Sequence, residues 1–68
     1  MDIVDARGLL CPEPVVLTQR AVKDGAKQLT VLVDAEAAKE NVTRFAISRG
    51  YSVSVETNGT DVTLTLAK

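Results

Sequence analysis

Cys11 is the side chain of this sequence with the most reactive chemistry, and it stands alone. The chain contains one cysteine and no histidine, so the thiol has neither an internal disulfide partner nor an imidazole base. Cys11 precedes Pro12, Glu13 and Pro14, where a helix is predicted to begin. Helix N-termini carry unpaired N–H groups and a partial positive charge, and both favour the nucleophilic thiolate. Cys11 is therefore predicted to act as a solitary nucleophilic sulfur.

The two prolines have opposing effects on this thiol. They fix φ and keep the helix from growing back over Cys11, but they also remove N–H groups near the sulfur. Glu13 adds a carboxylate that raises the thiol pKa, and Pro14 disfavours helical backbone at Glu13, so the regular helix is expected to begin at Pro14. We expect a pKa modestly below the ordinary value of about 8.5. Pro12 and Pro14 are predicted to act on presentation of the sulfur more than on folding stability.

Cys11 and the residues before it can each be interpreted as functional or as structural. Unpaired cysteines are commonly buried small hydrophobes, so an inert Cys11 is the alternative to a reactive one. Asp5 is interpreted as a residue that orders the loop, and Gly8 as one that the loop backbone requires. Arg7, the nearest basic residue in the sequence, either faces the sulfur or a partner, or is simply solvated.

Composition limits the function classes. Sixty-eight residues predict one small domain, residues 1–68. One cysteine without histidine cannot fill a zinc site, and no glycine-rich phosphate loop indicates a cofactor. A formal net charge of −1 with interspersed signs argues against nucleic acid as a ligand. No segment has the length of a membrane span or the pattern of a signal peptide. A cytoplasmic monomer without metal or cofactor is the expectation.

The order of elements is predicted as βαβαββ. A strand over residues 3–6 is followed by a helix from the prolines to about Asp24, and a strand over 29–33 by a helix that Asp34 caps and Gly50 ends. Right-handed crossovers place both helices on one face of the sheet, with the start of the second helix at the same edge as Cys11. The residues predicted to face the core are Val15, Leu17, Thr18, Ala21 and Val22 in the first helix, Ala38, Val42, Phe45 and Ala46 in the second, and Tyr51.

The last two strands are predicted to form a hairpin. Asn58-Gly59 is the preferred loop of a type I′ turn and lies between two alternating runs. That turn pairs Thr57 with Thr60 and sets Glu56 opposite Asp61, a like-charge pair. It also puts the apolar residues of both strands on one face.

The segment Asp5-Ala6-Arg7-Gly8-Leu9-Leu10-Cys11-Pro12-Glu13-Pro14 resembles the signature of the TusA/SirA-like sulfur-carrier family. The resemblance implies an α/β (α+β) two-layer sandwich with sheet order 1-2-4-3 and strand 4 antiparallel. It also implies that Cys11 receives sulfur as a persulfide from a cysteine desulfurase and passes it to an acceptor protein, for example towards tRNA thiolation. By the same resemblance Asp5, Arg7, Gly8, Pro12, Glu13 and Pro14 support Cys11.

A narrower resemblance concerns three later segments. Val33-Asp34, Glu40-Asn41-Val42 and Ser48-Arg49-Gly50-Tyr51 are similar to the N-terminal domain of YedF-type proteins, which are linked to selenium metabolism. Those proteins join this module to a second domain, which the sequence lacks. The chain is thus either a stand-alone homologue or one domain of a two-domain protein.

Two functions of different classes follow. The first is a carrier of sulfur or selenium, sulfurtransferase-like, in which Cys11 becomes a covalent intermediate. The second is a binding or regulatory module in which Cys11 only shapes a contact loop. A thiol peroxidase is disfavoured because no resolving cysteine is present. Sulfur acceptance by Cys11 distinguishes the first two.

Overall fold

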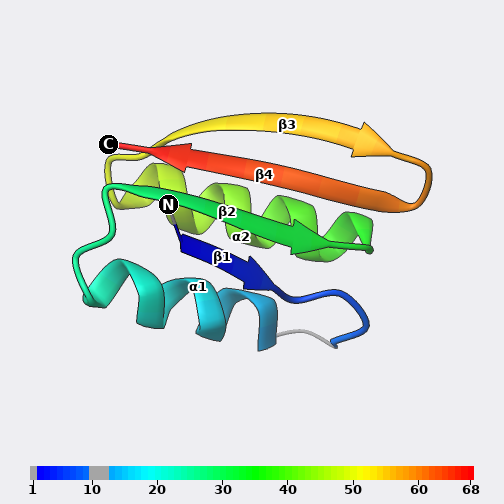
Figure 1. Cartoon of the computed structure of the whole chain (residues 1–68), viewed down its shortest axis with the longest axis horizontal. Coiled ribbons are helices and arrows are strands. Elements are labelled where there is room, and N and C mark those ends of the chain that lie inside the picture. Colours follow the sequence, from blue (N-terminus) through cyan, green and yellow to red (C-terminus); the bar gives the residue numbers. More distant parts are fainter. Residues whose placement is uncertain (1, 10–12) are drawn as a thin grey trace.

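The structure is a computed structural model that describes residues 2–9 and 13–68. Its elements are β1 (Asp2–Asp5), α1 (Glu13–Lys23), β2 (Gln28–Val33), α2 (Glu36–Ser48), β3 (Ser52–Asn58) and β4 (Asp61–Ala67). The four strands form one sheet in the order β1-β2-β4-β3 (Figure 1). β1 and β2 are parallel, and β4 is antiparallel to both of its neighbours. The predicted α/β two-layer sandwich and its strand order are confirmed.

The core lies between the sheet and the two helices. Burial alternates along the two central strands, as expected for a sheet covered on one face. The fully buried aliphatic side chains of these strands are Leu29, Val31, Val33, Leu64 and Leu66. The helices contribute buried Thr18, Ala38, Val42 and Ala46, with Val15, Leu17, Ala21 and Val22 partly buried against the same core. The predicted core is confirmed except for Phe45, which is partly buried but is not among the residues packed against this core.

The predicted register of the hairpin is wrong by two residues. Asn58 pairs with Asp61, so the loop is Gly59-Thr60 and not Asn58-Gly59. A type I′ turn needs positive φ at both loop positions, whereas a glycine at the first position alone is the pattern of a type II′ turn. Because side chains alternate with a period of two, this shift leaves every residue on its predicted face. It also sets Glu56 opposite Thr63, which removes the like-charge pair with Asp61.

None of the helices in the described part of the chain is long and apolar enough to cross a membrane.

The carboxyl ends of the parallel strands β1 and β2 lie at the same edge of the sheet. From that edge the chain leaves twice, towards α1 and towards α2 (Figure 1).

Candidate functional site

The candidate site is built on the connection that follows β1. Ala6 extends the pairing of β1 by one residue, since its N–H donates to the carbonyl of Leu32 at 2.8 Å. The side chain of Ala6 is buried, and its own carbonyl accepts a hydrogen bond from the N–H of Leu9 at 3.4 Å. The connection therefore starts from the core and turns outward immediately.

Asp5 and Arg7 hold this turn with a two-pronged ion pair. Arg7 donates from Nε to Asp5 Oδ1 at 2.9 Å and from Nη2 to Asp5 Oδ2 at 2.8 Å. The backbone N–H of Arg7 donates to Asp5 Oδ1 as well, at 3.2 Å. Parallel hydrogen bonds between a guanidinium and a carboxylate fix orientation as well as distance. Both side chains are exposed, so the pair orders the turn more than it stabilises the fold.

A second carboxylate, Asp61 at the start of β4, accepts from Arg7 Nη1 at 3.3 Å. The hydrogen bonds from Arg7 hold the pKa of Asp5 at about 2, well below its ordinary value. The pKa of Arg7 is raised by the same carboxylates, Asp5 first. Arg7 is thus engaged by two carboxylates, while its side chain stays exposed.

Asp34 supplies the next anchor. Its Oδ2 accepts a hydrogen bond from the N–H of Gly8 at 2.9 Å, across 26 positions of sequence. Gly8 has a φ of 77°, a left-handed conformation that glycine adopts without steric cost. The prediction that Asp34 caps α2 is wrong: the N-cap is Ala35, which makes no side-chain cap hydrogen bond. Asp34 instead ties the first connection to the end of β2.

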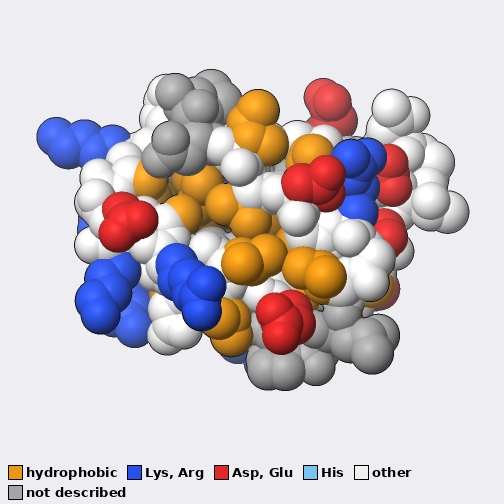
Figure 2. Space-filling view, turned by 60° about the horizontal axis from the view of Figure 1, so that its bottom comes forward, with side chains coloured by type: hydrophobic (Ala, Val, Ile, Leu, Met, Phe, Trp, Pro, Cys, Tyr) orange, Lys and Arg blue, Asp and Glu red, His pale blue; other side chains and the backbone are white. Residues whose placement is uncertain are grey.

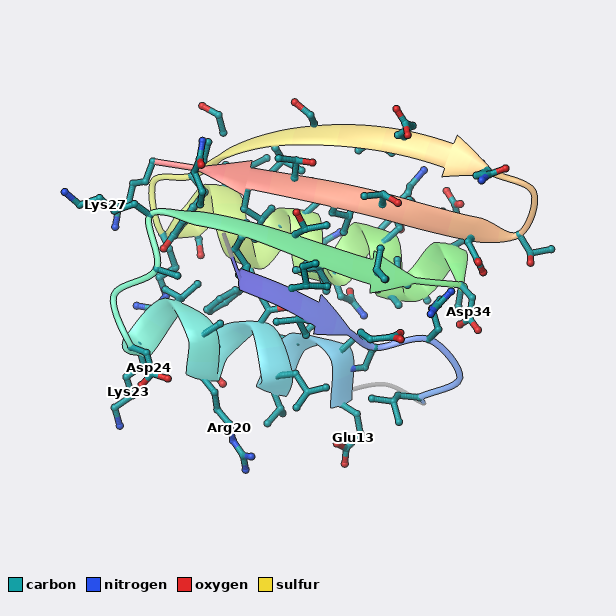
Figure 3. All side chains as sticks on the ribbon, viewed as in Figure 1. Glu13, Arg20, Lys23, Asp24, Lys27 and Asp34 are labelled. Carbon is teal, nitrogen blue, oxygen red and sulfur yellow. The ribbon has the colours of Figure 1, made fainter. Side chains whose placement is uncertain are left out.

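The far side of the connection is fixed by the first turn of α1. The helix begins at Glu13, one residue earlier than expected, and the exposed side chain of Glu13 points away from the sheet (Figure 3). Pro14 is buried, and its carbonyl accepts a hydrogen bond from the hydroxyl of Thr18 at 2.9 Å. The sequence predicted no packing role for Pro14. Its burial makes it part of the core as well as a helix-start residue.

Of the predicted site residues, the structure brings Asp5, Arg7 and Gly8 together. They line a shallow depression of about 550 Å³ with Leu9 and Asp34. Glu13 and Pro14 lie on the other side of the connection, and Cys11 and Pro12 lie outside the described residues.

Sequence reasoning missed the contacts of two acidic residues. Asp34 follows directly after β2, so its position at the shared edge was predictable, but its hydrogen bond to Gly8 was not. Asp61 is brought near Arg7 by the pairing of β4 with β2, in which Val62 lies opposite Val33. The described residues contain no group of three or more metal-ligating side chains. What the arrangement does is hold both ends of the connection that contains Cys11.

Comparisons with known proteins identify the family of this chain. The sequence pattern of the family described as "Sulfurtransferase TusA" matches residues 2–68. "Putative sulfur carrier protein MJ0990" of Methanocaldococcus jannaschii is 38% identical over 55 residues, which cover 78% of this chain and 73% of that protein. "Putative sulfur carrier protein YrkI" of Bacillus subtilis is 31% identical over 62 residues, 88% of this chain and 83% of the relative.

A solved structure shows the same fold. The crystal structure of a SirA-like protein from Desulfitobacterium hafniense superposes with a TM-score of 0.86 at 30% sequence identity, and covers 97% of this chain and 95% of that one. The sequence pattern and this superposition both span nearly all of the chain, including the strand, the connection and the helix that frame Cys11. The chain belongs to the TusA family of sulfur carrier proteins.

Proposed function

We propose that Cys11 carries sulfur between two proteins as a persulfide. The Cys11 thiolate attacks the terminal sulfur of a persulfide on a cysteine desulfurase. The new S–S bond forms on Cys11 while the S–S bond of the donor breaks, and the donor cysteine leaves as a thiolate. An acceptor thiolate then removes the terminal sulfur from Cys11 by the same exchange, so neither step needs an external oxidant or reductant.

The observation that supports the proposal is the set of contacts that the motif residues make around the connection. The side chain of Asp5 and the backbone N–H of Gly8 are engaged in hydrogen bonds at the start of the connection, and Pro14, just after its end, is buried. Arg7 is occupied by Asp5 and Asp61. A carrier needs such a fixed support, because it must offer the sulfur to two partners in the same geometry. It does not need a neighbouring base, which suits a chain without histidine.

The proposal includes the setting of the reaction. The protein acts as a monomer in the cytoplasm, where free thiols stay reduced. Its donor is a cysteine desulfurase, and its acceptor is a protein on a route such as tRNA thiolation. The similarity to YedF-type proteins makes selenium a second possible cargo, since selenium and sulfur are exchanged by the same thiolate chemistry.

Incubation with a cysteine desulfurase and cysteine, followed by intact-mass measurement, tests the proposal. The protein should gain the mass of one sulfur atom, lose it on reduction with dithiothreitol, and gain nothing as Cys11→Ser. An unchanged wild-type mass beside an active desulfurase would contradict the carrier function. The binding or regulatory module, in which Cys11 only shapes a contact loop, would then be the better explanation.

A further inference from the structure

The end of the molecule opposite the β1–α1 connection carries most of its positive charge. Both helices end there, β2 begins there and β4 ends there (Figure 1). Five of the eight Lys and Arg side chains of the chain belong to these segments. They are Arg20, Lys23, Lys27, Arg49 and Lys68, here called the basic end. Figure 2 shows the blue side chains gathered at one end of the molecule and most red ones at the other.

None of these cations forms an ion pair with a carboxylate in the described part of the protein. The ion pairs there involve only Arg7 and Lys39. Among the side chains that the structure describes, the acidic residue at this end is Asp24, which lies beside Lys23 in Figure 3. A chain with a formal net charge of −1 therefore keeps a cluster of unpaired positive charge on one end.

A groove lies within the basic end. It has a volume of about 530 Å³ and is lined by Gln19, Val22, Lys23, Phe45, Arg49 and Lys68. Val22 and Phe45, both partly buried, supply apolar surface from facing turns of α1 and α2. Lys23, Arg49 and Lys68 supply the charge. The groove thus combines an apolar surface with a cationic rim.

Two of the rim cations are placed by aromatic rings. The guanidinium carbon of Arg49 lies 5.1 Å from the centre of the Phe45 ring, and Lys68 Nζ lies 5.0 Å from the centre of the Tyr51 ring. Contacts of this kind restrict the cation before any ligand arrives, which lowers the entropy cost of binding. Lys27 and Lys68 are also joined through their backbones, since the N–H of Lys68 donates to the carbonyl of Lys27 at 2.9 Å.

Helix dipoles account for only part of the cluster. Arg20 and Lys23 lie in the last turn of α1, and Arg49 directly follows α2, so each interacts favourably with a helix C-terminus. Lys27 lies in the loop before β2 and Lys68 follows β4, where no helix end needs a cation. The charge at this end therefore exceeds what the helices require.

We propose that the basic groove binds an acidic segment of a partner protein that carries one bulky apolar side chain. The apolar side chain fills the space between Val22 and Phe45, and carboxylates on either side meet Lys23, Arg49 and Lys68. Charge complementarity favours a short segment over nucleic acid, because a long polyanion would extend from the basic end onto the acidic remainder of the surface. This inference is independent of the sulfur-carrier function.

The proposal can be tested by titrating the ¹⁵N-labelled protein with a short synthetic peptide in which Glu and Asp residues flank one Phe. Binding is followed by the chemical shifts of the backbone amides. The largest shifts are expected at Gln19, Val22 and Phe45. The double variant Lys23→Gln/Arg49→Gln should weaken binding by roughly tenfold or more. Arg44→Gln, which removes an exposed α2 cation outside the groove, should leave the affinity unchanged.

Changes to the peptide give a second test, which does not depend on whether the protein variants fold correctly. Replacing Phe in the peptide by Ala, or all its acids by Gln and Asn, should each weaken binding, and added salt should weaken it further. Equal binding of the neutral peptide would overturn the proposal, as would shifts that avoid the groove. Tighter binding of a single-stranded RNA, or of phosphatidylglycerol vesicles, through the same residues would overturn it in favour of another class of ligand.

Discussion

The two strand-to-helix connections leave the same edge of the sheet but are held in different ways. The first, between Asp5 and Glu13, is long: side-chain hydrogen bonds hold its first residues, and the buried Pro14 follows its end. The second, between Val33 and Glu36, is only Asp34 and Ala35, and no side chain caps the helix that follows. The first connection contains Cys11, and the second does not contain a candidate reactive group.

Asp34 links the two connections. It stands where a cap for α2 was predicted, yet its carboxylate accepts the N–H of Gly8 in the neighbouring connection. The α2 N-terminus has no side-chain acceptor because the N-cap position is Ala35, and such a helix is less stable than a capped one by about 0.5–2 kcal/mol. The polar residue at this edge therefore fixes the backbone before Cys11 and leaves α2 uncapped.

The largest effect is expected when the backbone of the first connection is strained. Gly8→Val places a branched side chain at a φ of 77° where no atom lies within 4 Å of the added Cβ. The cost is therefore backbone strain, about 1–3 kcal/mol in the free energy of unfolding. Urea unfolding should show this loss, and the rate of sulfur acceptance from the desulfurase should fall with it.

Gly25→Val is the matched control for that variant. Gly25 has a φ of 90° and equally open surroundings, but it follows α1 at the basic end. A similar loss of stability is expected, with an unchanged rate of sulfur acceptance. If both variants slowed sulfur acceptance equally, the effect would be one of global stability and not of the first connection.

The next effect concerns the acceptor that joins the connections. Asp34→Ala removes the partner of the Gly8 N–H and should lower the free energy of unfolding by about 1 kcal/mol. Hydrogen exchange of the Gly8 amide should become faster, while the first turn of α2 should be unaffected. Asp61→Ala, which removes only the longer contact to Arg7, should leave the Gly8 amide unchanged. Faster exchange confined to α2 would mean that Asp34 acts as its cap after all.

A smaller change in the opposite direction is expected from restoring the missing cap. Ala35 has φ −135° and ψ 142°, the extended backbone that an N-cap residue needs. Ala35→Ser should therefore raise the free energy of unfolding by about 0.5–1 kcal/mol. Ala37→Ser, at the second residue of α2, should lower the free energy of unfolding by about 0.5 kcal/mol, because serine is a weaker helix former than alanine. If thermal unfolding showed that Ala35→Ser is no more stable than Ala37→Ser, position 35 would not be the N-cap of α2.

The smallest effect is a pH dependence at Asp5. Its pKa is lowered from 3.8 to about 2 by Arg7, so the ion pair contributes fully above pH 3.8 and is lost as the pH falls towards 2. Carboxyl NMR titration should show this midpoint, and Arg7→Gln should return it towards 3.8. The stability difference between Arg7→Gln and the wild type should shrink over the same interval. An unshifted Asp5 in the wild type would show that the ion pair is absent in solution.

Much of the fold could be predicted from the sequence because its signals are local. Alternation in the strands and the helical stripe that includes Val15 and Thr18 assign each residue to a face. The hairpin register was not predictable in this way, because a shift of two residues leaves every face unchanged. The register depends instead on the preference of the turn and on the partner of Glu56, and in this hairpin the preference of Asn58-Gly59 for a type I′ turn does not decide it.

The candidate site was predictable in its residues but not in its bonds. Asp5, Arg7 and Gly8 follow from the family motif. The partners Asp34 and Asp61 lie 26 and 54 positions away from the residues they bind. Their roles depend on which strands are neighbours and on the register of β4. Neither property is encoded in the motif itself.

Tyr51 gives the protein a natural spectroscopic probe. It is the only tyrosine of a chain without tryptophan, and it is buried with its hydroxyl donating to the carbonyl of Ala26. Its emission therefore reports on the loop before β2 and on Lys68 above the ring. The chain has one thiol, in the β1–α1 connection, so a thiol-reactive dye has a single position at which to attach. Events at the two ends of the molecule can thus be followed separately in one sample, without engineered residues.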